Sequence, residues 1–127
     1  MWWKIPAGAL INIVTFVAIG TIGFIVMRLT WPAYAAVEKA MTFDTPMMAS
    51  RLGVSAVGSL IGAYLAGLTV RDARVTPLIG GLVLLAIFVP VHMQMWDKFP
   101  LWYHATFLTS LPLLALIGGS FAREAGV

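Results

Sequence analysis

The chain has 127 residues, of which 61% are hydrophobic and 10% charged, and its mean hydropathy is +0.94. Soluble domains carry about a quarter of charged residues, so the composition indicates a membrane protein. There is no cysteine, which excludes a disulfide framework, a thiolate nucleophile and a cysteine metal site. The formal net charge of +3 comes from basic residues scattered singly or in pairs, which argues against nucleic-acid binding.

The first predicted membrane span covers about residues 5–30. Residues 5–27 carry no charge and would reach about 34 Å as a helix, enough to cross a hydrocarbon layer of about 30 Å. A cleaved signal peptide is the alternative, because Lys4 precedes the run. The uncharged stretch is longer than the roughly 7–15 residues usual for such a peptide, so we expect a retained span.

The longest connection leads from the first span to the second. Its stretch AYAAVEKAM, residues 33–41, combines good helix formers with an apolar stripe and predicts a short amphipathic helix on the outer membrane surface. Asp44 or Thr45, followed by Pro46, is expected to cap the next helix. The second span is predicted over residues 52–70.

Small residues recur at helical spacing along the second span. This pattern lets helix backbones approach closely and predicts that the second span is the central packing helix. It leaves open whether the partner is another helix of the chain or a second copy. One strip holds Gly58, Gly62 and Ala66, and the next holds Ser55, Ser59, Ala63 and Gly67.

The third and fourth spans are predicted over residues 77–95 and 101–121, with Pro90 and Pro112 inside them. Prolines are tolerated in membrane helices because neighbouring groups satisfy the freed carbonyls. The predicted fold is therefore all-α: a single domain, residues 1–127, forming an antiparallel bundle of four transmembrane helices with a short outer amphipathic helix between the first and second.

The orientation depends on the positive-inside rule. Four basic residues are expected at each face, so their number does not decide the matter. Arg71 and Arg74 are concentrated in a short hairpin connection, and this density favours a cytoplasmic location for the hairpin and for both termini. We expect a multi-pass protein of the bacterial inner membrane.

A set of ionisable and aromatic residues is expected at the outer ends of the helices. His92 lies about one turn from the end of the third span and His104 about one turn into the fourth. The connection between these spans is short, so the two imidazoles can approach each other. The predicted ligand-binding residues are Arg28, Arg51, His92, His104, Trp102 and Tyr103.

Arginine and histidine without an intramembrane acid make a positive pocket, suited to an anion, a lipid head group or a quinone-like ligand. Copper(I) ligation is a less favoured alternative, with His92, His104, Met47, Met48, Met93 and Met95 as the candidate ligands. Haem ligation by the two histidines is another, and we expect no metal and no cofactor. The competing interpretation is an interfacial aromatic belt with snorkelling arginines and no ligand.

No Asp or Glu lies within any predicted span, which argues against a proton-coupled multidrug exporter. The chain also has no GxSxG, P-loop, HExxH or GxGxxG pattern, and no nucleophile can be placed beside a base. An enzyme is therefore the least supported class.

The first prediction is an accessory or self-associating membrane component whose partners are lipids, a second copy or a larger complex. The alternative is a binder or transporter of a small ligand at the outer pocket.

Three features taken together resemble a loosely defined group of small four-helix bacterial membrane proteins. They are WPAY after the first span, the small-residue second span and FPLWYH at the start of the last. We attach no activity, cofactor or fold to that group. The resemblance therefore implies no role for any residue.

Overall fold

The computed structural model describes residues 2–126, among which there are helices and no strand. Each of the four long helices is long and apolar enough to cross a membrane, which confirms the predicted all-α bundle. The long helices are α1 (Lys4–Thr30), α3 (Thr45–Val70), α4 (Val75–Gln94) and α5 (Leu101–Glu124), and the short ones are α2 (Pro32–Val37) and the 3-10 helix η1 (Trp96–Lys98).

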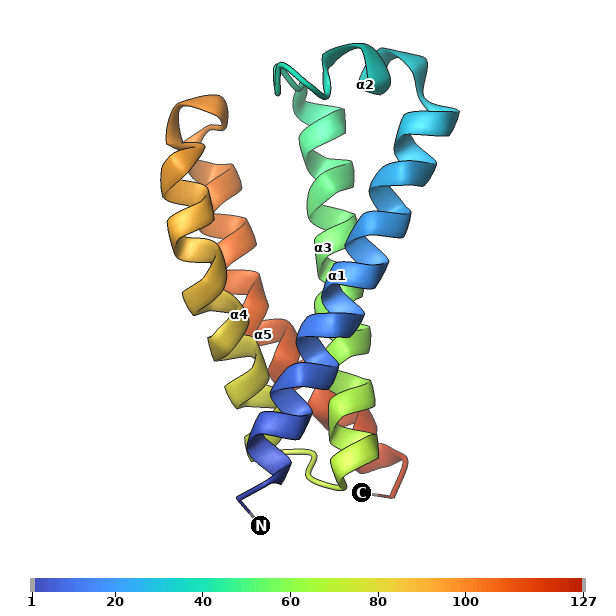
Figure 1. Ribbon diagram of the computed structural model, residues 1–127, viewed down its shortest axis with the longest axis vertical. Helices are drawn as coiled ribbons and strands as arrows, with labels where there is room; N and C mark the ends of the chain where they lie inside the picture. Colours follow the sequence, from blue (N-terminus) through green and yellow to red (C-terminus); the bar gives the residue numbers. More distant parts are fainter. Residues whose placement is uncertain (1, 127) are drawn as a thin grey trace.

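The long helices form a ring in the order α1, α3, α5, α4. Helix α3 packs against α1 and α5, and α4 packs against α5 and α1. Both chain ends lie at one end of the bundle, which we call the termini end, and α2 lies at the opposite end, the loop end (Figure 1). Four consecutive crossings with both chain ends on one side are what an antiparallel bundle requires.

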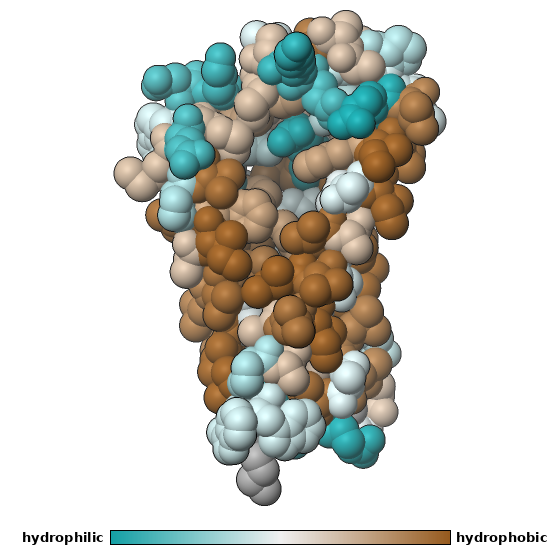
Figure 2. Space-filling view, in the orientation of Figure 1, coloured by the Kyte–Doolittle hydropathy of each residue, from teal (hydrophilic) through white to brown (hydrophobic). Residues whose placement is uncertain are grey.

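The outer surface of the bundle is apolar over its middle. Large hydrophobic side chains are exposed on all four long helices, and Figure 2 shows them as a continuous band, with hydrophilic residues concentrated at the loop end. Without water in the bilayer core such side chains face lipid at no cost. The chain is a multi-pass membrane protein.

The short helix in the connection between α1 and α3 ends earlier than predicted. Helix α2 ends at Val37, and residues 38–41 form a turn in which Met41 adopts a positive φ of 58°. Asp44 is the N-cap of α3, and its side chain accepts a hydrogen bond from the Met47 N–H at 3.0 Å. Helix α3 thus begins at Thr45, well before residue 52, because the predicted cap is used.

The hairpin between α3 and α4 is fixed by Asp72. Its carboxylate accepts hydrogen bonds from the backbone N–H groups of Arg74, Val75 and Thr76 and, at 2.8 Å, from the Thr76 hydroxyl. Burial disfavours the charged carboxylate, but these hydrogen bonds outweigh that effect and lower the pKa of Asp72. A single side chain thus satisfies the first donors of α4.

Replacing this cap should destabilise the protein in a pH-dependent way. We expect Asp72→Ala to lower the free energy of unfolding by about 1 kcal/mol at neutral pH. A carboxyl group whose folded pKa is depressed stabilises above its unfolded pKa, about 3.9, and loses that contribution as the pH falls through the folded value. Unfolding in detergent at several pH values should therefore show a difference between the two proteins that is largest above about pH 4. A difference that grows on acidification would contradict the assignment.

Close helix contacts are concentrated in the half of the bundle near the termini. A Cβ atom on Gly118 of α5 would lie 2.6 Å from the Leu60 carbonyl oxygen of α3. One on Gly81 of α4 would lie 2.9 Å from the Leu111 oxygen of α5. Only glycine permits these approaches, so the backbones here pack directly on one another.

The predicted strip of small residues on α3 is used within the chain. Gly58 faces Phe16 and Gly62 faces Asn12, both on α1, while Ala66 is fully buried. The strip therefore packs α3 against α1 rather than lying free on the surface.

Toward the loop end the two pairs of helices, α1 with α3 and α4 with α5, diverge (Figure 1). The contacts in this half are made by large rings. Phe16 of α1 meets Phe88 of α4 edge to face at 5.2 Å and Phe107 of α5 at 6.4 Å. Small residues at one end and phenylalanines at the other give the bundle its wedge shape.

Candidate functional site

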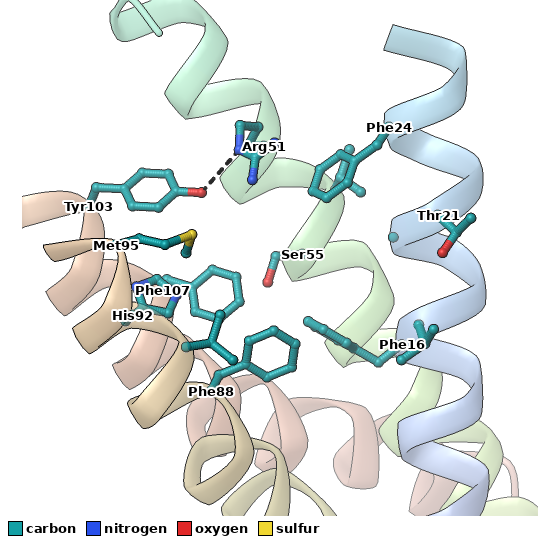
Figure 3. Close-up of a pocket in the computed structure, with 14 residues that line it drawn as sticks. Phe16, Thr21, Phe24, Arg51, Ser55, Phe88, His92, Met95, Tyr103 and Phe107 are labelled. Carbon is teal, nitrogen blue, oxygen red and sulfur yellow. Dashed lines mark hydrogen bonds between the residues drawn. The ribbon is translucent and has the colours of Figure 1, made fainter. Parts of the chain in front are cut away.

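A cleft of about 300 Å³ lies where the two helix pairs diverge. Its deeper part is lined by Phe16, Phe88 and Phe107, and its end nearest the loops by Arg51 and other polar groups (Figure 3). In the space-filling view the hollow opens sideways, between α4 and α1, at the upper edge of the apolar band (Figure 2). The cleft is thus open to the region that lipid chains occupy.

Arg51 is the charged residue of the cleft, and aromatic side chains hold it in place. Its Nη1 donates to the Tyr34 hydroxyl at 2.8 Å and its Nε to the Tyr103 hydroxyl at 3.4 Å. Its guanidinium carbon lies 4.4 Å from the centre of the Phe24 ring and 4.8 Å from that of Phe43. Such cation–π contacts fix a cation without neutralising it.

No carboxylate neutralises Arg51 directly. Among residues 2–126 the one side-chain ion pair joins Arg28 to Glu38. Burial raises the pKa of Tyr34, so the hydroxyl that Arg51 contacts remains neutral. Glu38 attracts Arg51 from a distance but makes its ion pair with Arg28, so the Arg51 guanidinium can still pair with an anionic group in the cleft.

The two histidines form a buried pair behind Arg51. Their Nδ1 atoms are 2.7 Å apart, and His104 Nε2 lies 3.2 Å from the Trp96 carbonyl oxygen. His92 is 2% exposed and His104 1%. Phe107 covers His92, with ring centres 4.4 Å apart, and the Trp96 ring stacks on His104 at 4.5 Å. The predicted approach of the imidazoles is confirmed.

Ser55 contributes a hydroxyl that has no partner in the described chain. It lies one turn after Arg51 on α3, lines the cleft and is 5% exposed. Its Oγ makes no hydrogen bond with residues 2–126. Figure 3 shows its side chain on the side of α3 that faces α4. A buried hydroxyl without a partner costs free energy, which a bound polar group would recover.

The structure separates the predicted ligand-binding residues into two groups. Arg51, His92 and Tyr103 line the cleft, and His104 supports His92 from behind. Trp102 is 44% exposed on the outside of α5. Arg28 does not join the cleft: its side chain is 51% exposed and donates to Glu38, whose pKa is lowered by that hydrogen bond. The prediction that Arg28 belongs to the ligand-binding set is therefore not met by the cleft, because Glu38 in the connection after α2 binds Arg28.

Sequence reasoning missed the residues that shape the cleft. Phe16, Phe88 and Phe107 have no polar atom and are typical of any membrane span, so nothing in the sequence distinguishes them. Ser55 was identified only as a small packing residue. Its spacing of four from Arg51, which puts both on one helix face, is the signal that could have revealed it.

The distances around His92 and His104 argue against copper(I) or haem iron bound between the two histidines. Two nitrogens bound to one ion at about 2.0–2.1 Å in a tetrahedral site are more than about 3 Å apart, whereas the Nδ1 atoms of His92 and His104 are 2.7 Å apart and joined by a hydrogen bond. Met93 is 69% exposed and does not line the cleft that holds His92. No group of three or more His, Asp or Glu within residues 2–126 could hold a metal ion.

No protein-family model, no curated protein and no solved structure matches this chain.

Proposed function

We propose that this protein binds a single-chain anionic amphiphile taken from the membrane. The anionic head group, a carboxylate or phosphate, pairs with Arg51, and the first part of the chain lies against Phe16, Phe88 and Phe107. The observation that carries the proposal is the Arg51 cation, which faces an apolar cleft and has only neutral partners there. Arginine binds planar and tetrahedral oxyanions through paired donors.

The size and opening of the cleft fit such a ligand. A volume of about 300 Å³ is at the lower end of the roughly 300–1,000 Å³ of small-molecule sites, so it takes a head group and only part of a chain. The sideways opening between α1 and α4 (Figure 2) leaves the rest of the chain in lipid. A ligand can enter without leaving the bilayer.

A purely accessory or self-associating function has less support from these contacts. Helix faces that associate in lipid are rich in small residues, and on α3 the strip of Gly58, Gly62 and Ala66 is buried inside the chain. The cleft, in contrast, holds a cation and a hydroxyl whose hydrogen-bonding capacity is unused. We therefore rank ligand binding above association.

The proposed setting is the bacterial inner membrane, with both termini in the cytoplasm. The α3–α4 connection and the end of α5 lie at the termini end (Figure 1), and they carry Arg71, Arg74 and Arg123. The positive-inside rule favours the cytoplasm for short basic connections. The cleft then opens near the outer leaflet, and its ligand comes from that leaflet.

Binding of radiolabelled myristate to the purified protein in nanodiscs tests the proposal. Wild-type protein should bind myristate at least about tenfold more tightly than myristyl alcohol, because a charge-assisted hydrogen bond contributes about 1.5–3 kcal/mol. Arg51→Gln should remove that preference. Comparison of the two probes on wild-type protein requires no variant, so a folding defect in Arg51→Gln would not obscure the result.

Arg28→Gln is the matched control, since Arg28 lies on the same side of the membrane but outside the cleft and is bound to Glu38. It should change myristate affinity by less than about twofold. Equal affinity of wild-type protein for the acid and the alcohol, or equal losses in the two variants, would contradict the proposal.

A further inference from the structure

The hydrogen bonds of the histidine pair fix the position of every ring proton. A carbonyl oxygen only accepts, so His104 must carry its proton on Nε2 to donate to Trp96 O. Neutral His104 then has a bare Nδ1, to which His92 donates from its own Nδ1 over 2.7 Å. Both rings are buried among aromatic side chains, which favours the uncharged pair. His92 is thereby left with a bare Nε2, an obligate acceptor.

We place this acceptor in the cleft, because His92 lines the cleft and its other ring nitrogen, Nδ1, is already directed at His104. His92 lines the cleft from α4, and Nε2 has no hydrogen-bond partner in residues 2–126. Ser55 lines the same cleft from α3, with a buried hydroxyl that also lacks a partner. Two unused polar groups on facing helices, one an acceptor and the other able to donate and accept, are complementary to a hydroxyl.

We infer that the ligand of this cleft carries a hydroxyl group close to its anionic head, and that His92 and Ser55 recognise it. The inference rests on the proposed function and names the class of ligand more narrowly. Arg51 and Ser55 are four residues apart on α3, about 6 Å along the helix axis, so the hydroxyl lies within a few bonds of the head group. A bare Nε2 repels a second anionic oxygen, so the pocket distinguishes a hydroxylated amphiphile from one with a second acid in that place.

A pair of probes that differ by one hydroxyl tests this recognition. Wild-type protein in nanodiscs should bind 3-hydroxymyristate about fivefold or more tightly than myristate, as expected for one additional hydrogen bond. His92→Phe and Ser55→Ala should each bring this ratio, measured for both acids on the same variant, close to one, whatever the variant does to the affinity for myristate itself. Ser110→Ala is the control serine, because its hydroxyl donates to the Phe107 carbonyl within α5, and it should leave the ratio unchanged.

The proton positions can be measured without any ligand. With only two histidines in the chain, nitrogen-15 NMR of histidine-labelled protein should show unprotonated His92 Nε2 and His104 Nδ1, and protonated His92 Nδ1 and His104 Nε2. Addition of 3-hydroxymyristate should shift the His92 Nε2 resonance most. A protonated His92 Nε2 in the free protein would overturn the inference.

The possible results distinguish a failure of hydroxyl recognition from a failure of the proposed binding of an anionic amphiphile. If neither acid binds, the proposed function is wrong. If the two acids bind equally and Arg51→Gln weakens both, the cleft binds an anionic amphiphile without recognising a hydroxyl, and only the inference is overturned. If the ratio is large but survives both His92→Phe and Ser55→Ala, another part of the protein recognises the hydroxyl and the assignment is wrong.

Discussion

Replacement of Gly118 by alanine is expected to destabilise the bundle by about 1–3 kcal/mol or more. The added Cβ would lie 2.6 Å from the Leu60 carbonyl oxygen, 2.8 Å from the Ala63 Cβ and 3.1 Å from the Tyr64 nitrogen. Two of these are backbone atoms of α3 and cannot turn aside, so α3 and α5 must separate. The free energy of unfolding in mixed micelles, with helicity measured by circular dichroism, gives the magnitude.

Gly53→Ala is the matched control for this substitution. Gly53 is also inside a long helix, but it is exposed, and nothing lies within 4 Å of an added Cβ. Alanine is favoured over glycine in a helix by roughly 0.5–1 kcal/mol, so this variant should be slightly more stable than wild type. Equal effects of the two substitutions would show that the close α3–α5 contact does not stabilise the fold.

The number and approximate position of the long helices could be predicted from the sequence, because the bilayer imposes them. A span needs about 20 apolar residues, and charged or polar residues interrupt the chain at those intervals. The predicted span begins at residue 52, whereas helix α3 begins at Thr45, directly after the predicted Asp44 cap, since hydropathy marks where lipid begins and not where hydrogen bonding begins. Asp44, identified as a possible cap, was the better guide to that boundary.

The candidate site was predictable only in part. Chain topology alone brings His92 and His104 together, since the two helices are joined by a short connection. Arg51 and Arg28 look alike in the sequence, and only the fold shows that Glu38 binds one of them and aromatic rings surround the other. The cleft itself forms because small residues let the helix pairs pack closely at the termini end, while phenylalanines keep them apart toward the loop end. Which residues face each other in this way is known only from the three-dimensional packing.

Tyr34 connects the loop end of the fold to the function of the cleft. It is fully buried, stacks on Phe43 with ring centres 5.3 Å apart and accepts the hydrogen bond from Arg51. Phe43 in turn stacks on Phe99, just before α5. These rings attach α2 and the following turn to the ends of the long helices. The same contacts hold the Arg51 guanidinium at the polar end of the cleft.

Removing the Tyr34 ring should therefore damage both stability and binding. We expect Tyr34→Ala to lower the free energy of unfolding by about 3–5 kcal/mol, as for other buried aromatic side chains, and to increase hydrogen exchange across residues 32–43. Tyr34→Phe keeps the stacking and loses the hydrogen bond to Arg51, so it should lose less stability, about 1.5–3 kcal/mol at most.

The corresponding control is Trp102→Ala, which removes a large ring that is 44% exposed on the outside of α5 and should cost less than about 1 kcal/mol in the same detergent.

Tyr34→Phe should also weaken myristate binding, because a guanidinium released from one of its two hydroxyl partners loses part of its fixed orientation. Unaltered exchange over residues 32–43 in Tyr34→Ala would mean that other contacts hold this segment. Unaltered myristate affinity in Tyr34→Phe would mean that Arg51 is positioned by the aromatic rings alone.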